Sequence, residues 1–464
     1  MSSRRSLVQI NPTNQGNNVY SFRGGTNTII FDIPMTPAIL NGKSVSINGV
    51  FNTFTGVGTA RPTNRSSPDG VIIPGQPGAG GATSQDVFID PRTGVNSAID
   101  FITIQSLEGT TYEQVKNYNR LSASIINLQD GIKSYLNGGV NMTYGAVGKT
   151  QQQGRMCDTK INFSMDLLCG FMQSAPIDLQ LCRGLRITLS LASDLFVLGN
   201  NFWKNGIANG GTADSGAFYT ITDVNMSYEL EVPDAAGQQA MVANQSGSWD
   251  YNAYSSFYQV IQSTDMNAVM NVNTSRTIST IMNLIPSSFL NNYSYNSNWA
   301  TKMMTPNAAG RLTNQLPIVE LTFTKGGLRV PLDFEVRTLE EEEQGVATSL
   351  KTREELNAVR DVWAMSSFMK SLRTELSLNL NDLPSGVARF SDSMTENDAI
   401  SVNGIGVKYD GITANGINFK GTPLGLRLQS SPPLGSTLDP HSLFAFVYHK
   451  NTIMFQNGQV KVIN

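Results

Sequence analysis

Thr28-Ile29-Ile30-Phe31-Asp32-Ile33-Pro34 and, much later, Thr280-Ile281-Met282-Asn283-Leu284-Ile285-Pro286 share one pattern: apolar, largely β-branched residues that end in Ile-Pro. Three further landmarks occur twice and in the same order. Ile99-Asp100-Phe101 is matched by Leu332-Asp333-Phe334, Leu107-Glu108 by Leu339-Glu340, and Gly184-Leu185-Arg186 by Gly425-Leu426-Arg427. A period near half the chain length indicates two fused copies of one domain, because solenoids repeat every 20 to 50 residues.

The composition is that of a β-rich globular protein. Hydrophobic residues make up 40% of the 464 residues, which is enough for real cores, and charged residues only 15%. Much of the polar surface must come from Asn, Ser, Thr and Gln, which together with 42 glycines favour turns and strands over helix. The formal net charge of −3 gives no global basic field, so we expect no direct sequence-specific binding of nucleic acid.

The cysteines and the chain start predict a protein made inside the cell. Cys157, Cys169 and Cys182 cannot pair completely and show no Cys-x-x-Cys spacing, which predicts reduced core thiols. Polar sequence rather than an apolar stretch follows Met1, so we expect no signal peptide. No apolar run reaches the ~18 residues of a membrane span.

The order of segments predicts an all-β protein of two tandem units. We expect an N-terminal arm at 1–19 with Arg4 and Arg5, a first unit at 20–232, a small polar linker at 233–255 and a second unit at 256–464. Each unit holds about eight short strand patterns, for which an antiparallel jelly-roll β-sandwich is the usual fold. A long Gly/Pro-rich loop is expected at 52–97.

Each unit is also expected to carry one prominent helix in a loop. Apolar residues recur every three or four positions in both halves. The first stripe is Tyr112, Val115, Tyr118, Leu121 and Ile125; the second, after a Thr352/Glu355 capping box, is Leu356, Val359, Trp363, Met369, Leu372 and Leu376. Near the end of the chain, Asn457-Gly458 predicts a β-hairpin.

Candidate catalytic and binding motifs are weak. Residues 145–150 end like a phosphate-binding loop, but Thr143 stands where the first glycine is needed. His441 and His449 have no partner at metal-ligand spacing, so strand-edge or surface roles are favoured over catalysis. The acidic run at 340–343 fits a solvated turn or helix start better than a metal site.

Asp100 and Asp333 occupy equivalent repeat positions, which favours a structural role performed twice over a pair of glycan-cleaving carboxylates. From the motifs as a whole, we expect no catalytic residue, no cofactor and no metal.

With these residues in view, the chain resembles the double jelly-roll major capsid proteins of dsDNA viruses, a lineage that includes virophages, polinton-like viruses, adenoviruses and certain tailless membrane-containing phages. The tandem strand pattern carries the resemblance. Residues 332–336 run into a helix, residues 218–229 resemble the strand that closes the first jelly roll of this lineage, and residues 454–460 match its C-terminal hairpin.

The resemblance implies a homotrimer whose six jelly rolls form a pseudo-hexameric capsomer of an icosahedral capsid, and hence a place in the virion. It implies neighbouring capsomers, penton proteins and minor capsid proteins as partners, and it leaves contact with an internal membrane open. Two other functions are alternatives: a minor capsid or spike component of the same class of virus, and a two-domain carbohydrate-binding or carbohydrate-cleaving β-sandwich protein.

Overall fold

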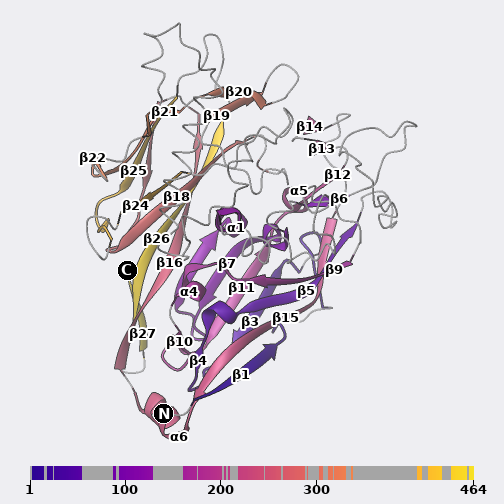
Figure 1. The fold of residues 1–464 in the computed structure, drawn as a ribbon, viewed down its shortest axis with the longest axis vertical. Helices are drawn as coiled ribbons and strands as arrows, with labels where there is room; N and C mark the ends of the chain where they lie inside the picture. Colours follow the sequence, from indigo (N-terminus) through magenta and orange to yellow (C-terminus); the bar gives the residue numbers. More distant parts are fainter. Residues whose placement is uncertain are drawn as a thin grey trace.

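A computed structural model of the chain describes most of the strand regions in both halves (Figure 1). The described residues are 3–14, 18–24, 26–54, 87–89, 94–128, 160–174, 176–200, 203–204, 207–208, 218–244, 246–262, 265–287, 290, 303–306, 312–316, 318–330, 336–337, 405–409, 416–430, 440–456 and 459–464. Several predicted features lie outside them: Cys157, Asp333, the residues at 145–150, the acidic run at 340–343, the second helix and most of the 52–97 loop.

The first half folds into two facing antiparallel sheets. One sheet has the order β1, β15, β5, β9, and the other has the order β3, β11, β7, β8. The bounds are β1 Ser3–Ile10, β3 Thr28–Ile33, β5 Ser46–Phe54, β7 Ile99–Gln105, β8 Thr111–Lys116, β9 Lys160–Asp166, β11 Leu185–Leu191 and β15 Phe218–Pro233. Counted along the chain, strands one, eight, three and six share one sheet, and strands two, seven, four and five share the other, which is a jelly roll.

The second half repeats this topology. One sheet has the order β16, β26, β18, β24, and the facing sheet has β17, β25 and β21, with β22 and β23 both paired to β21. The bounds are β16 Ser246–Ile261, β17 Asp265–Met270, β18 Thr277–Pro286, β21 Ile318–Lys325, β22 Leu328–Arg329, β23 Val336–Arg337, β24 Ile405–Lys408, β25 Leu424–Ser430 and β26 His441–Gln456. The predicted pair of tandem jelly rolls is therefore confirmed.

Shorter elements complete both halves. The remaining strands are β2 Val19–Tyr20, β4 Ile39–Leu40, β6 Val87–Ile89, β10 Ile177–Asp178, β12 Leu198–Asn200, β13 Trp203–Lys204, β14 Ile207–Ala208, β19 Met303–Pro306, β20 Leu312–Leu316 and β27 Gln459–Ile463. The helices are α1 Tyr118–Leu128, α4 Gly170–Gln173, α5 Asp194–Val197 and α6 Ala235–Ala243, with 3-10 turns η1 Gly42–Ser44 and η2 Gly94–Ala98. The predicted C-terminal hairpin is present, because Gln456 of β26 pairs with Gln459 of β27.

The topology corrects one of the paired landmarks. The Gly-Leu-Arg motifs at Gly184 and Gly425 do stand at the start of the seventh strand in each half. The opening pair does not match, since residues 28–33 form the second strand of the first half and residues 277–286 form the third strand of the second. Alternating β-branched residues specify a half-buried strand but not its place in the sheet.

The expected arm and linker contain regular structure. Residues 3–10 form β1, which pairs along its whole length with β15, from Ser3 opposite Pro233 to Ile10 opposite Met226. The sequence signal was weak because β1 is an edge strand in which only Val8 and Ile10 are partly buried apolar residues, while Arg4, Arg5 and Gln9 are exposed. Within the expected linker, α6 is followed by the start of β16. We now interpret α6 as the connection between the two sandwiches.

The expected first helix is shorter than its apolar stripe. Tyr112 and Val115 belong to strand β8, and only Tyr118, Leu121 and Ile125 lie on α1. All five side chains are buried. Both faces of β8 carry buried residues, so Tyr112 and Val115 are buried three positions apart although they lie on a strand. The apolar spacing alone therefore did not separate the strand from the helix.

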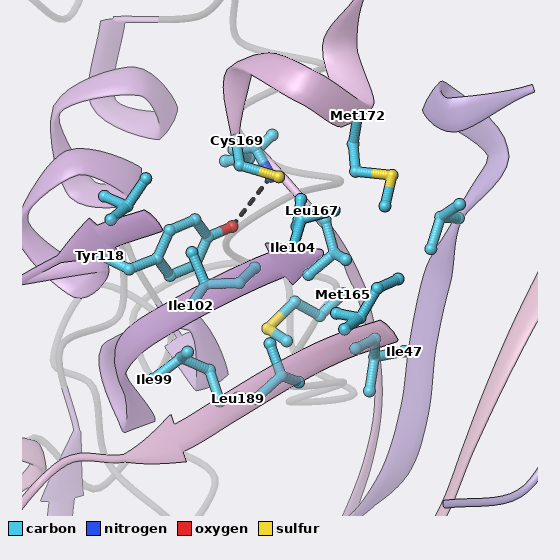
Figure 2. Close-up of a cluster of buried hydrophobic side chains, with 14 of the residues drawn as sticks. Ile47, Ile99, Ile102, Ile104, Tyr118, Met165, Leu167, Cys169, Met172 and Leu189 are labelled. Atoms are coloured by element: carbon cyan, nitrogen blue, oxygen red, sulfur yellow. Dashed lines mark hydrogen bonds between the residues drawn. The ribbon is translucent and has the colours of Figure 1, made fainter. Parts of the chain in front are cut away.

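The described apolar residues form two buried clusters. The larger one fills the first sandwich, where Ile102 and Leu189 from one sheet face Ile47 and Met165 from the other (Figure 2). It continues across the junction to aromatic residues of β16 and β26. The second cluster lies within the second sandwich and runs from Ile261 to Val447. Each half therefore has its own core, and the first core also supports the second half.

Gly184 gives a test of this packing. Its φ is +69°, and an added Cβ would lie 2.7 Å from Leu107 Cδ1 and 2.8 Å from the Ile33 carbonyl oxygen. Gly109 also has a positive φ, +95°, but an added Cβ would meet nothing within 4 Å. We expect Gly109→Ala to cost roughly 1 kcal/mol of strain and Gly184→Ala roughly 1–3 kcal/mol more, measured by urea unfolding. Equal costs would contradict the close packing at Gly184.

Candidate functional site at the junction between the two sandwiches

The two sandwiches meet along one strand from each half. Strand β8, the fifth strand of the first sandwich, pairs in parallel with β16, the first strand of the second, through Gln114 and Ser255. This single pair joins the two four-stranded sheets edge to edge, so that one continuous sheet runs through both halves. Lys116 N also donates to Ser256 Oγ at 2.9 Å, at the end of β8.

Glu113 of β8 holds this junction together. Its buried carboxylate accepts hydrogen bonds from Gly170 N at 3.0 Å, Phe171 N at 2.7 Å and Tyr254 N at 2.7 Å. The first two donors open helix α4 of the first half, and the third belongs to β16 of the second half. One carboxylate therefore satisfies backbone donors from both sandwiches, where these donors have little access to water.

The surroundings of Glu113 are apolar and close-packed. Burial raises the pKa of Glu113 to about 7, although the three backbone donors act in the opposite direction. Gly170 lies so near β16 that an added Cβ would be 2.9 Å from Ala253 Cα. The Phe171 ring stacks on Tyr112 and meets Tyr251 edge-on, with centroids 5.1 Å apart in both cases. These contacts fix the position of β16 against α4.

A buried cation makes a second link between the halves. Arg120 of α1 lies with its guanidinium carbon 4.8 Å from the Phe196 ring centroid and 5.1 Å from that of Phe444, which belongs to the second half. Its Nη2 donates to the Leu290 carbonyl at 3.1 Å. Aromatic faces and a carbonyl are suitable partners for a guanidinium shielded from water.

Asp100 lies near this cation. Burial raises the pKa of Asp100, and the charge of Arg120 opposes that shift. This placement supports the structural interpretation of Asp100. Its repeat partner Asp333 lies outside the described residues.

His449 has a geometry that invites a catalytic reading. Its Nε2 lies 2.9 Å from Ser255 Oγ, and its Nδ1 lies 2.9 Å from Asn451 Oδ1. Burial lowers the pKa of His449 to about 4, which makes the imidazole a weak proton acceptor at neutral pH. Its buried position next to the junction fits a role in holding β16 to β26, which differs from the strand-edge or surface placement expected from the sequence.

The other predicted candidates among the described residues, His441, Cys169 and Cys182, are also buried. His441 begins β26 in the interior. Cys169 and Cys182 are free and buried, and burial raises the pKa of both thiols, so they are poor nucleophiles. Within the described residues, no group of three or more His, Cys, Asp or Glu is placed to hold a metal ion. No helix in the described part of the chain is long and apolar enough to cross a membrane.

Sequence reasoning missed the two residues that link the halves. Glu113 is a charged residue at an inward position of the Tyr-Glu-Gln-Val alternation, and Arg120 is the one basic residue in an otherwise uncharged helix. Both are lone charges among residues that pack into a core. A single charge in an apolar pattern is visible in the sequence, but the sequence does not show which groups surround that charge.

Comparison with solved structures supports the fold. The capsid of virus PBCV-1, in a quasi-atomic model, matches with a TM-score of 0.56 at 10% identity, over 100% of this chain and 98% of that one. The Faustovirus major capsid protein matches with a TM-score of 0.55 at 11% identity, over 98% of this chain and 91% of that one. A chain of the Sputnik virophage structure matches with a TM-score of 0.51 at 9% identity, over 99% of this chain and 88% of that one.

No protein-family model matches the sequence, and no curated protein sequence matches it either. At identities near one residue in ten, the structural likeness shows the fold. The chain folds as a double jelly roll like those capsid proteins, as the sequence resemblance implied.

The role of Glu113 predicts a large cost for its removal. Glu113→Ala leaves three buried backbone donors without an acceptor, and we expect it to lower the free energy of unfolding by roughly 3 kcal/mol or more. Glu113→Gln keeps one acceptor oxygen and should cost less. Urea unfolding followed by fluorescence measures both. If Glu113→Ala lowers the free energy of unfolding no more than a substitution at an exposed position such as Glu231→Ala, the carboxylate does not hold the junction.

The pKa of Glu113 also predicts how stability depends on pH. Because its folded value of about 7 exceeds the usual 4.5, the folded protein keeps a proton that the unfolded chain has lost between these values. The free energy of unfolding contributed by Glu113 therefore falls as the pH rises from 4.5 to 7, by up to ~3 kcal/mol. His449 acts in the opposite direction below pH 6.5, so the measurement compares wild type with Glu113→Gln at each pH. A constant difference between them would contradict the prediction.

Proposed function

We propose that this chain is a major capsid protein that assembles as pseudo-hexameric homotrimers to tile an icosahedral viral shell. The observation that carries the proposal is the side-by-side junction of two sandwiches with the same strand order, joined through β8 and β16. A threefold assembly of such a chain places six similar units around one axis. Its outline is then close to sixfold, which suits packing in a hexagonal lattice.

A tile of this kind needs a fixed angle between its two units. Glu113 ties α4 and β16 together, and Arg120 packs between Phe196 of the first half and Phe444 of the second. The apolar cluster of the first sandwich also extends across the junction. These contacts favour a rigid two-unit body over two domains on a flexible linker.

The solved capsid structures support the proposal through their fold. The buried titratable groups at the junction already have hydrogen-bonding partners in the structure, which suits a structural protein rather than an enzyme. In the proposed role the chain's partners are its own copies and neighbouring capsomers, together with penton and minor capsid proteins. Its location is the capsid of the virion.

The proposal is tested by measuring the mass and shape of the purified protein. Size-exclusion chromatography with light scattering is expected to give three times the 50.4 kDa monomer. Negative-stain images should then show particles with a near-hexagonal outline. A monomer that persists at high concentration would contradict the proposal, and binding of that monomer on a glycan array would favour the carbohydrate-binding alternative.

A further inference from the structure

We propose that the outer edge of β17, the second strand of the second sandwich, is a docking site for an extended segment of a partner protein. The segment adds to the sheet as a further strand beside β17. It carries a glutamate and, two positions away, an apolar residue. Docking at this edge does not depend on how copies of the chain assemble, so it goes beyond the proposed function.

The equivalent edge of the first sandwich is covered by the chain itself. Strand β3 holds the second position there, as β17 does in the second sandwich. Thr13 N donates to the Ile30 carbonyl oxygen at 2.7 Å, and Ile30 N donates to Asn14 Oδ1 at 3.0 Å. Asn14 Nδ2 also donates to the Thr28 carbonyl oxygen at 2.7 Å. A stretch of polypeptide therefore satisfies the outer edge of β3.

The second sandwich has no such cover from its first strand. In the first half, β1 and β2 pair with β15 in succession, and residues 13 and 14 lie in the break between them. In the second half, β16 pairs with β26 from Ser246 to Ile261 without a break. An uninterrupted first strand leaves no residues free to reach the edge of β17.

The connection into β17 is too short to cover its edge. Only residues 262–264 link β16 to β17. Three residues span roughly 10 to 14 Å, and facing sheets lie about 10 Å apart. The link is therefore needed to cross between the sheets and cannot turn back along β17. Within the described residues, β17 pairs along its whole length with β25 and with no second strand.

The exposed side chains of β17 indicate what docks there. Asn267 and Val269 lie on the solvent face of the strand, and Val269 is 61% exposed. The cross-strand partner of Val269 is Gly425, so β25 presents no side chain beside it. Gly425 has no room for a larger residue, because an added Cβ would overlap Thr324 Oγ1. An apolar residue on an added strand would cover Val269 from its other side.

A cation on the same face gives the segment its charge. Arg427 of β25 is exposed and is the cross-strand partner of Asn267. In the part of the chain that the structure describes, its guanidinium has no ion pair or hydrogen bond. An added strand would lie about 10 Å from β25, which is two strand spacings. An arginine and a glutamate together span that distance across the shorter Asn267, so a glutamate opposite Asn267 complements Arg427.

Strand addition uses both features of the edge. Proteins usually blunt open edges with prolines, bulges or charges. Strand β17 carries neither a proline nor a bulge, and its one charged residue is Asp265 at its start. Main-chain hydrogen bonds to such an edge supply affinity, and alternate side chains supply specificity. Val269 and Arg427 therefore select a segment in which a glutamate and an apolar residue are two positions apart.

A synthetic peptide tests the docking site. The probe is a fluorescein-labelled peptide of sequence Thr-Thr-Glu-Thr-Val-Thr-Thr with blocked ends. Fluorescence anisotropy is expected to show saturable binding to the purified protein with a Kd of roughly 100 μM or tighter. The control is the same peptide with N-methyl groups on the glutamate, the central threonine and the valine. It lacks main-chain donors on both of its edges and should not bind.

Variants of the protein test the two side chains. Val269→Gln should weaken binding of the probe by about fivefold. Arg427→Gln should abolish the preference for the probe over a peptide with glutamine in place of its glutamate. Leu7→Gln, which changes an exposed apolar residue of β1 in the other sandwich, is the matched control and should leave the Kd unchanged. Because all three side chains are exposed, thermal unfolding should match that of wild type.

Hydrogen exchange measured by mass spectrometry locates the bound probe. Exchange of amides in residues 265–270 should slow when the probe is added, while exchange in residues 28–33, whose edge is already covered, should not change. Absence of saturable binding, equal binding of the N-methylated peptide, or protection that spares residues 265–270 would each overturn the inference. A trimer that fails these tests leaves the proposed function standing, and a monomer that passes them refutes the proposed homotrimer but not the docking site.

Discussion

Glu113 accepts hydrogen bonds from three backbone N–H groups, two in α4 and one in β16, and the relative position of the two sandwiches depends on this contact. A backbone donor has a fixed direction, so a carboxylate shared by three of them allows little rotation of one half against the other. Apolar packing at Phe171 and Tyr251 adds free energy but is less directional. Directional bonds inside an apolar shell therefore define the angle of the two-unit body.

The same junction shows what duplication makes available. Every open sandwich has a first-strand edge and a fifth-strand edge, and inside this chain one of each is joined through Gln114 and Ser255.

Several features of the fold could be predicted because they depend on residues that are close together in the sequence. The resemblance of residues 218–229 to a closing strand agrees with β15, and Asn457-Gly458 predicted the final hairpin, since both patterns depend on neighbouring residues. The repeated Gly-Leu-Arg located the seventh strand in each half, where Gly184 needs a positive φ in a crowded position. The polar edge strand β1 and the Tyr112–Val115 segment of β8 escaped local reasoning, because tertiary contacts decide their state.

The sequence by itself determined the class of the protein: two β-sandwiches in tandem, with low charge and buried thiols. Those properties follow from composition and from the periodicity of neighbouring residues, and neither depends on which strands pair. Only the tertiary structure decided which strands are neighbours, that β8 meets β16, and that Glu113 and Arg120 link the halves. The pair between β8 and β16 joins residues more than a hundred positions apart, and the partner of a lone buried charge is fixed by such pairing and not by its neighbours in sequence.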